Sequence, residues 1–406
     1  MQNEGASQMD AIRGSVKDEP ESGIMTPINY GFGRQGLIPL WSGEGSLPTP
    51  AFISEACNAS LTRGETFYTW QRGIPELRQA LATYHQRLYR KDFSPENFFV
   101  TGGGMQSIQL AMQILTGEGD EVIIPTPAWP NYAAPLRLKG ARPVEIPMTY
   151  AATGWSLDLD HLFDAVTERT KVIVLNTPSN PLGWVATLED LVAIRDMARS
   201  RGLWIVSDEV YSRFYFSAGG TSSLPPSFID VCDMEERLIM ANTFSKNWAM
   251  TGWRVGWMSA PKLLGDAIEN LIQYNTSGTA AFMQHGCIKA LEDGEEFLAQ
   301  QIALARANRD FVSRRLSEID GIDFAMPEGA FYLFFKVEGM QDSMAASLRI
   351  IDEAGVGLAP GSAFGPGGEG FMRICLLRER HHTEEATGRL VRWFKNTWFG
   401  SRSGRA

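Results

Sequence analysis

The chain has 406 residues, of which 44% are hydrophobic and 21% are charged, values close to the averages for globular proteins. This length suggests two or three domains and excludes a small scaffold that needs disulfides or metals to fold. The 37 Lys and Arg residues are outnumbered by 47 Asp and Glu, and a net charge of -10 argues against nucleic-acid binding. The four cysteines lie far apart, so we expect reduced thiols, no disulfide framework and no metal site.

The hydropathy pattern argues against a membrane protein. There is no run of eighteen apolar residues, and the N-terminal segment mixes both charges without the apolar core of a signal peptide. These features predict a soluble, cytoplasmic protein. Residues 1 to about 25 and the C-terminal SRSGRA are polar and aperiodic, so we expect both ends to be loose tails.

Between about residues 66 and 260, short apolar runs alternate with helical patterns, which predicts α/β layers around a mostly parallel sheet. A helix is expected from Pro75, because Leu77, Leu81, Tyr84 and Leu88 recur at helical spacing. A second helix should follow the glycine turn TGGG. The expected strands are 97–100, 121–125, 171–175, 203–207, 237–241 and 254–258.

The pattern changes at about residue 300 and predicts a second, smaller α+β domain. Its expected elements are helices at 300–316, 342–354 and 383–398 and strands at 331–337 and 371–376. Gly355 is placed to end the helix at 342–354. Ligands of such proteins commonly bind between the domains, at the carboxyl ends of the strands.

Five polar or glycine-rich segments follow predicted strands. They are TGGGMQS (101–107), PTPAWPNY (125–132), LNTPSNPLG (175–183), IVSDEVY (205–211) and NTFSKNWAMTGWRVGW (242–257). Each one alone has an ordinary structural explanation, such as a tight turn, a buried tryptophan, a capped acid or a solvated lysine. The first also lacks the third glycine of a dinucleotide-binding fingerprint, because position 107 is Ser.

Taken together, the five segments indicate one kind of ligand. A glycine turn at a helix N-terminus can hold a phosphate, and Trp129 between prolines can stack on a flat ring. Asp208 at the end of a buried strand needs a cap or a cationic partner. Lys246 lies near hydroxyls and Arg254, which suit phosphate capture. A phosphorylated aromatic cation that bonds to a lysine would fit, and pyridoxal phosphate is such a molecule.

In this order the segments resemble the class I/II aminotransferases of the aspartate aminotransferase superfamily, the fold type I pyridoxal-phosphate enzymes. The resemblance extends from about Leu40 to Arg373 and includes LWSGEGSLPTP, FYTWQRGIPELRQALA, PEGAFYLFF, APGSAFG and FMRIC. It implies a large domain with a mostly parallel seven-stranded sheet between helices, plus the smaller α+β domain. The implied ranges are 1–50 for the tail and an arm joining the small domain, 51–295 for the cofactor-binding domain and 296–406 for the small domain.

The resemblance also implies roles for individual residues around pyridoxal 5'-phosphate. Lys246 would bond to the cofactor and move the proton at the substrate Cα, while Asp208 would keep the pyridine nitrogen protonated. Asn180 and Tyr211 would bond to the phenolic oxygen of the ring, and Trp129 would stack on its face. The residues expected to hold the phosphate are Gly103, Gly104, Met105, Thr243, Ser245 and Arg254. Many relatives have Lys or Ser where this chain has Met105.

The substrate and subunit contacts follow from the same resemblance. Arg373 would clamp the substrate α-carboxylate, with Asn180 and the backbone of Ser42 and Gly43 nearby. Tyr68 would reach the cofactor phosphate of a neighbouring subunit, which implies a homodimer with shared sites. The expected partners are therefore amino acids, 2-oxo acids and a second copy of the chain, with no nucleic acid and no membrane.

The function expected from these residues is exchange of an amino group between an L-amino acid and a 2-oxo acid in two half-reactions. A β-lyase or a cyclopropane-forming synthase on the same scaffold is an alternative. A non-catalytic ligand-sensing domain is disfavoured, because no basic helix-turn-helix precedes the domain and Lys246 is present. Two kinds of donor stay open: Tyr30, Phe32 and Trp41 would favour aromatic side chains, whereas Arg34 would receive a distal carboxylate.

Overall fold

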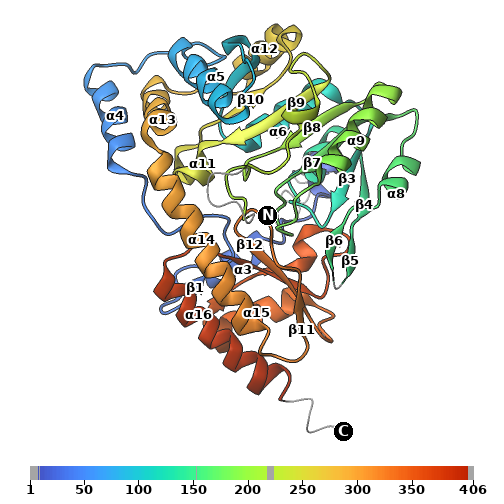
Figure 1. Cartoon of the computed structure of the whole chain (residues 1–406). Coiled ribbons are helices and arrows are strands. Elements are labelled where there is room, and N and C mark those ends of the chain that lie inside the picture. The colour runs from blue at the N-terminus through green and yellow to red at the C-terminus, as the bar shows by residue number, and fades with distance from the viewer. Residues whose placement is uncertain (1–7, 9, 152, 217–223, 401–406) are drawn as a thin grey trace.

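A large sheet flanked by helices forms one part of the molecule, and a four-stranded sheet with its own helices forms the other (Figure 1). The computed structural model describes residues 8, 10–151, 153–216 and 224–400. The C-terminal SRSGRA and most of the first nine residues, both expected to be loose, lie outside the described residues.

The large sheet has seven strands in the order β2-β10-β9-β8-β7-β3-β4, of which β10 alone runs antiparallel to its neighbours. Its members are β2 (Phe98–Thr101), β3 (Glu121–Thr126), β4 (Arg142–Pro147), β7 (Thr170–Asn176), β8 (Trp204–Asp208), β9 (Leu238–Thr243) and β10 (Gly256–Ser259). All residues of β2, β3, β9 and β10 are buried, as expected for strands covered on both faces. The prediction of a mostly parallel seven-stranded α/β sheet is confirmed.

The sequence located six of these seven strands, with boundary errors of one or two residues. It missed β4 because Arg142–Pro147 contains two prolines and only one fully buried residue, features of an edge strand that periodicity does not detect. The strand expected from residue 254 begins at Gly256 instead. Arg254 cannot extend it, because its backbone φ of 56° is left-handed.

Helices cover both faces of the large sheet. The helices of this part are α4 (Ala51–Thr62), α5 (Pro75–Tyr89), α6 (Gly104–Leu115), α7 (Ala133–Lys139), α8 (Leu159–Asp164), α9 (Leu188–Arg201), α10 (Phe228–Val231), α11 (Phe244–Asn247), α12 (Gly265–Asn275) and α13 (Ala281–Asp293). Of these, α4 packs against α13 rather than against the sheet (Figure 1). The helix predicted from Pro75 is α5, and Leu77, Leu81 and Tyr84 are buried as its stripe required. Among the residues described, no helix combines the length and apolarity needed to cross a bilayer.

The C-terminal part contains an antiparallel sheet in the order β11-β12-β15-β14. Its elements are α14 (Glu295–Leu316), β11 (Ile322–Phe324), β12 (Tyr332–Val337), α15 (Ser343–Ala354), β14 (Ala359–Pro360), β15 (Phe371–Cys375) and α16 (Arg380–Trp393). Gly355 ends α15 with a φ of 64°, as predicted. The last predicted helix starts three residues earlier than expected and becomes a π-helix at Phe394–Trp398.

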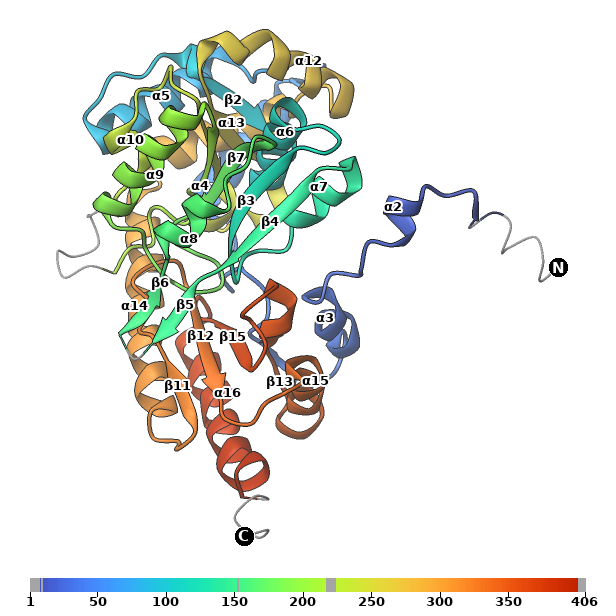
Figure 2. The same ribbon diagram turned by 90° about the vertical axis from the view of Figure 1, so that its right-hand side faces the viewer.

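The N-terminal segment contacts both parts of the molecule. It contains α2 (Gly14–Lys17), α3 (Met25–Gly31) and β1 (Ile38–Pro39), and β1 pairs in parallel with β13 (Val356–Gly357) near the C-terminal sheet. The expectation of a loose tail to about residue 25 is wrong for the described residues. The Glu19 carboxylate accepts two hydrogen bonds from Arg137 of α7, at 2.6 and 2.9 Å, which attaches this segment to the large part (Figure 2).

The buried stripe of α5 allows a direct test of the fold. Leu81 is fully buried against the core beneath α5, so Leu81→Ala should lower the free energy of unfolding by about 2–5 kcal/mol. Gln79 lies on the exposed face of the same helix, and Gln79→Ala should change it by less than about 0.5 kcal/mol. Urea unfolding followed by tryptophan fluorescence measures both values, and equal effects would contradict this orientation of α5.

Candidate functional site

A cavity of about 200 Å³ lies where the large sheet, the N-terminal segment and the C-terminal sheet meet. The carboxyl ends of parallel strands β7 and β8 reach it with Asn176 and Asp208, and Lys246 reaches it from α11, directly after β9. The complete lining is Ile24, Gly43, Gly104, Met105, Trp129, Tyr132, Asn176, Asn180, Asp208, Val210, Tyr211, Thr243, Ser245, Lys246, Arg254, Tyr332 and Arg373. The cavity therefore occupies the strand-end position at which α/β proteins bind ligands.

Asp208 is a buried carboxylate held by two donors. The Tyr132 hydroxyl donates to its Oδ2 at 2.6 Å, and the Val210 backbone N–H donates to its Oδ1 at 3.2 Å. Burial raises the pKa of Asp208 to about 6, although both hydrogen bonds and the charge of Lys246 act in the opposite direction. Burial also raises the pKa of Tyr132, so its hydroxyl stays protonated and able to donate.

Lys246 is held by a contact to the N-terminal segment. Its Nζ donates a hydrogen bond to the carbonyl oxygen of Gly43 at 2.7 Å. Burial, helped by the positive charges of Arg373 and Arg254, lowers the pKa of Lys246 to about 8, although Cys375 and Glu44 act in the opposite direction. A fraction of this amine is consequently neutral near pH 8 and able to act as a base or nucleophile. Position 43 requires glycine, because a Cβ there would overlap the hydroxyl of Tyr332.

The glycine turn before α6 forms an anion-binding cradle with Arg254. Gly103 has a φ of 90°, and a Cβ at this position would lie 2.7 Å from Nη2 of Arg254. Gly104 and Met105 open α6 directly after it, and the first N–H groups of a helix have no carbonyl partner in the preceding helical turn. Opposite them, the hydroxyl of Thr243 accepts from the Ser245 N–H at 3.1 Å and donates to the Ser245 Oγ at 2.9 Å. A helix N-terminus, hydroxyls and a guanidinium together suit a phosphate.

Arg373 is a buried cation with spare hydrogen-bonding capacity. It lies in β15, donates from Nη1 to Oδ1 of Asn180 at 2.7 Å, and donates from Nη2 to the carbonyl oxygen of Trp41. Its guanidinium lies 4.4 Å from the ring centre of Tyr332. Its Nε is buried and finds no hydrogen-bond partner within the described part of the chain. An unpartnered donor of this kind beside a cavity is suited to an anionic ligand.

Tyr211 and Tyr332 form a hydroxyl pair on one side of the cavity. Their Oη atoms lie 2.7 Å apart, and both side chains are buried. Tyr211 follows β8, whereas Tyr332 begins β12, so this hydrogen bond connects the two sheets. Asn180 is oriented in turn by its backbone N–H, which donates to Oδ1 of Asn176 at 2.7 Å.

Most site residues predicted from the sequence come together in this cavity. They are Gly43, Gly104, Met105, Trp129, Asn180, Asp208, Tyr211, Thr243, Ser245, Lys246, Arg254 and Arg373. Gly103 contacts Arg254 just outside the lining, and Ser42 does not line the cavity. Tyr68 is far from burial, with 93% of its surface exposed, and it is not part of the lining within this chain.

Five lining residues were not predicted: Ile24, Tyr132, Asn176, Val210 and Tyr332. Asn176, Tyr132 and Val210 lie inside segments that the sequence had already singled out, so their positions carried a signal, although their contacts did not. Tyr332 stands in PEGAFYLFF among apolar residues and reads as an ordinary core tyrosine. Ile24 reaches the cavity because the N-terminal segment is attached to α7.

The residues considered for the substrate mouth lie elsewhere. Arg34 forms an ion pair with Asp352, and the Tyr30 hydroxyl donates to the same carboxylate at 2.8 Å. Phe32 is 86% exposed, and Trp41 packs into the core while its carbonyl oxygen holds Arg373. None of the four side chains lines the cavity, so neither proposal for the mouth fits this geometry.

Comparison with known proteins identifies the family. The model of aminotransferase class I and II matches residues 36–390. The chain is 34% identical over 360 residues to a probable aspartate/prephenate aminotransferase of Aquifex aeolicus, covering 87% of this chain and 90% of that protein. It is 36% identical over 368 residues to aromatic-amino-acid aminotransferase 2 of Thermococcus litoralis, covering 89% and 93%.

Solved structures lead to the same result. The fold matches an aspartate aminotransferase from Thermotoga maritima with a TM-score of 0.87 at 31% identity, covering 95% of this chain and 100% of that one. It also matches an aromatic aminotransferase from Pyrococcus horikoshii with a TM-score of 0.83 at 33% identity, covering 92% and 99%. The resemblance stated from the sequence is confirmed. The chain belongs to the aminotransferase class I and II family and is an enzyme of the fold type I aminotransferase group.

Proposed function

We propose that the cavity binds pyridoxal 5'-phosphate and that the enzyme uses it to exchange an amino group between an L-amino acid and a 2-oxo acid. The observation that carries this proposal is the meeting of three groups in one cavity. These are the amine of Lys246, the buried carboxylate of Asp208 and the unpartnered buried nitrogen of Arg373. Lys246 matches the cofactor carbonyl, Asp208 the cofactor ring nitrogen and Arg373 the substrate carboxylate.

The residues present fit the cofactor. The cradle of Gly103, Gly104 and Arg254 suits its phosphate, and Asp208 suits a protonated ring nitrogen. Trp129 lines the cavity and is available to stack on the ring. When bound, the cofactor supplies an electron-withdrawing ring that stabilises negative charge developing at the substrate Cα.

Lys246 is the proposed base and acid at the substrate Cα. Its lowered pKa keeps a neutral fraction at mildly alkaline pH, and a neutral amine can accept a proton and return it. The Gly43 carbonyl directs Nζ into the cavity, since it accepts a hydrogen bond there. Asn180 and Tyr211 are proposed to donate to the phenolic oxygen of the ring.

Arg373 is proposed to bind and orient the substrate. A carboxylate near its Nε would complete the hydrogen bonding of the guanidinium, whose Nη atoms are already fixed by Asn180 and Trp41. Hydrogen bonds to charged groups contribute about 1.5–3 kcal/mol each. This anchoring would fix the Cα of the substrate within reach of Lys246.

The lining favours amino donors with uncharged side chains. Its cations are Lys246, Arg254 and Arg373, and each is needed for the reacting groups described above. The remaining surface is mainly apolar or aromatic, with Ile24 and Met105 available to contact a substrate side chain. The named relatives include both aspartate and aromatic aminotransferases. For this enzyme we propose aromatic or aliphatic donors rather than dicarboxylic ones.

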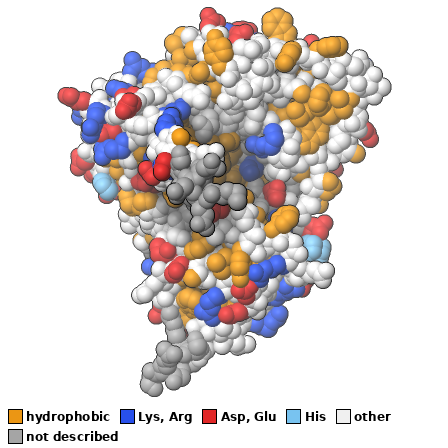
Figure 3. Space-filling view, turned by 180° about the vertical axis from the view of Figure 1, so that it is seen from behind, with side chains coloured by type: hydrophobic (Ala, Val, Ile, Leu, Met, Phe, Trp, Pro, Cys, Tyr) orange, Lys and Arg blue, Asp and Glu red, His pale blue; other side chains and the backbone are white. Residues whose placement is uncertain are grey.

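We also propose a homodimer in which Tyr68 reaches the cofactor phosphate of the neighbouring subunit. Phe67, Tyr68, Trp70 and Tyr274 are exposed by 84%, 93%, 66% and 82%, an unusual concentration of large rings. Hydrophobic side chains gather over the side of the molecule that carries α4 and α5 (Figure 3). Burial of these rings between two subunits would explain them.

We propose the domain ranges 51–295 and 296–406, which the resemblance to the family implies. Helix α14 begins at the boundary between them. A cytoplasmic location is likewise proposed from the composition and the acidic charge. The domain ranges and the location are supported by the sequence, not by the geometry of the site.

The central test is a half-reaction. Holoenzyme mixed with an amino acid and no acceptor should release the matching 2-oxo acid and convert the cofactor to pyridoxamine phosphate. Phenylalanine or leucine should react at least about tenfold faster than aspartate, since the cavity offers no spare cation for a second carboxylate. Product analysis by liquid chromatography and absorbance measures both outcomes.

Lys246→Ala should lower the half-reaction rate by about 10²–10⁴, the usual contribution of general acid–base catalysis. Lys289→Ala is the matched control, because Lys289 is an exposed lysine paired with Asp293. In a parallel reaction with serine, whose β-hydroxyl can leave as water, release of pyruvate and ammonia without pyridoxamine phosphate would indicate a lyase and contradict the proposal. Faster reaction of aspartate would contradict only the proposed donor class.

Tyr132→Phe should shift the acidic limb of the rate profile to higher pH. The tyrosine bond favours the ionised form of Asp208, so its loss should raise the pKa of that carboxyl by roughly half to one unit. Activity requires ionised Asp208, and the loss should therefore be greater at pH 6 than at pH 8. Tyr89→Phe is the control, since the hydroxyl of half-buried Tyr89 donates to Glu209 rather than to Asp208. Identical profiles for wild type and Tyr132→Phe would refute this role.

Subunit sharing predicts a specific complementation pattern. Mixing Lys246→Ala with Tyr68→Ala chains should return about a quarter of wild-type activity. Half of the dimers are then mixed, and each of these has one intact site of two. Mixing Lys246→Ala with Arg373→Ala should return almost none, because both residues belong to one subunit's site.

The experiment requires that Tyr68→Ala alone be impaired and that subunits exchange. With both shown, no gain from the Tyr68 mixture would rule out a shared site.

A further inference from the structure

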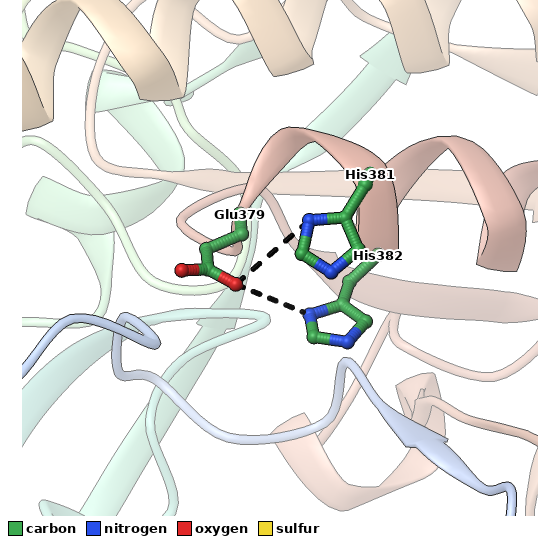
Figure 4. Close-up of side chains that lie close together, drawn as sticks. All are labelled: Glu379, His381 and His382. Carbon is green, nitrogen blue, oxygen red and sulfur yellow. Dashed lines mark ion pairs between the residues drawn. The ribbon is translucent and has the colours of Figure 1, made fainter.

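A group of three potential metal ligands lies outside the cavity, at the start of α16. Glu379 precedes the helix, and His381 and His382 occupy its first turn (Figure 4). One ligand atom from each residue lies within 4.8 Å of the other two. The Nδ1 atoms of His381 and His382 are 3.8 and 3.6 Å from the same carboxylate oxygen, Oε2 of Glu379. In the described ranges, this is the one group of three His, Cys, Asp or Glu residues with such spacing.

The backbone that carries these side chains is well fixed. The N–H of Glu379 donates to Oγ of Ser46 at 2.9 Å, which joins this turn to the N-terminal segment. The carbonyl oxygen of Glu379 accepts from the N–H and the hydroxyl of Thr383, at 3.1 and 3.3 Å. Because both peptide groups of Glu379 are held, only side-chain rotations are needed to bring its carboxylate to an ion.

The neighbouring arginines do not pair with the Glu379 carboxylate. Arg380 donates to Glu384 at 2.6 Å, and Nη1 of Arg378 donates to the carbonyl oxygen of Gly45 at 3.4 Å. The ion-pair partners of Glu379 that the structure describes are the two imidazoles. Their ring centres are 3.9 Å apart, so both rings lie on the same side of the helix end.

We propose that Glu379, His381 and His382 bind one divalent first-row transition-metal ion, with zinc as the best match. Zinc accepts two imidazole nitrogens and one carboxylate oxygen at about 2.0–2.2 Å, which places the ligand atoms about 3.3 Å apart in a tetrahedron. The two imidazole–carboxylate separations of 3.6 and 3.8 Å need to shrink by only a few tenths of an ångström. The imidazole nitrogens lie within 4.8 Å of each other, so side-chain rotation must bring them closer. Imidazole ligands disfavour calcium and magnesium, which prefer oxygen.

Solvent exposure leaves room to complete the coordination sphere. The side chains of Glu379, His382 and His381 are 43%, 46% and 69% exposed, so an ion can enter and keep water as its fourth ligand. The site begins six residues after Arg373, at the end of the turn that connects β15 to α16. The bound ion would therefore stabilise this turn without taking part in amino transfer, and the inference does not depend on the proposed function.

The test is a zinc titration of untagged holoenzyme by calorimetry, with excess magnesium present. One zinc ion per chain should bind, and the midpoint of thermal unfolding should rise. His381→Asn and His382→Asn should each weaken binding at least about tenfold, as expected when a ligand is removed. His285→Gln is the matched control, because His285 pairs with Glu65 at 3.1 Å and the described residues place no third ligand beside them. Its zinc affinity should equal that of the wild type.

Cobalt(II) gives an independent readout of the ligands. A cobalt difference spectrum with the visible bands of a low-symmetry nitrogen and oxygen site should appear in wild type and in His285→Gln. It should be lost in the double variant His381→Asn, His382→Asn. Circular dichroism and the half-reaction rate, which the double substitution should leave unchanged, confirm that this variant is folded. Absence of stoichiometric zinc binding, or equal binding by the double variant, would overturn the proposal.

Discussion

The structure depends on keeping a carboxylate charged inside the protein at the end of a central strand. Asp208 lies in β8, with strands on both sides and almost no exposure to water. Removing a carboxylate from water is costly unless donors and a positive charge replace the lost hydration. Here Tyr132, the Val210 N–H and nearby Lys246 supply them, and each comes from a different place after a strand. The order of the strands therefore brings together the groups that keep this carboxylate charged.

The site is built from residues of several separate parts of the chain. Arg373 comes from the antiparallel sheet, Asn180 from the loop after β7, and the Trp41 carbonyl from the N-terminal segment. The hydroxyl pair of Tyr211 and Tyr332 crosses the same boundary. Substrate recognition is thus coupled to the relative position of the two sheets, since a small displacement would separate the guanidinium from its partners.

The sequence predicted those features that depend on order along the chain. Asp208 and Lys246 were found because each follows a short apolar strand, and parallel strands bring such ends together. It did not predict the hydroxyl contacts of Tyr132 and Tyr332, since a hydrogen bond across 76 or 121 residues leaves no local pattern. The attachment of Glu19 to Arg137, 118 residues away, was missed for the same reason. Exposed Tyr68 acquires a role only if a second chain is present.

The pairing of β1 with β13 has a consequence for biosynthesis. Ile38 lies beside Val356, so the segment that carries Gly43 cannot take its place until most of the chain has left the ribosome. Until then the Lys246 amine lacks the carbonyl that directs it, and Arg373 has not yet been made. A prematurely terminated chain would hold the glycine cradle but neither a directed amine nor a carboxylate clamp. Chemical competence thus arises only when translation is nearly complete, because the glycine carbonyl and the guanidinium both depend on residues beyond position 350.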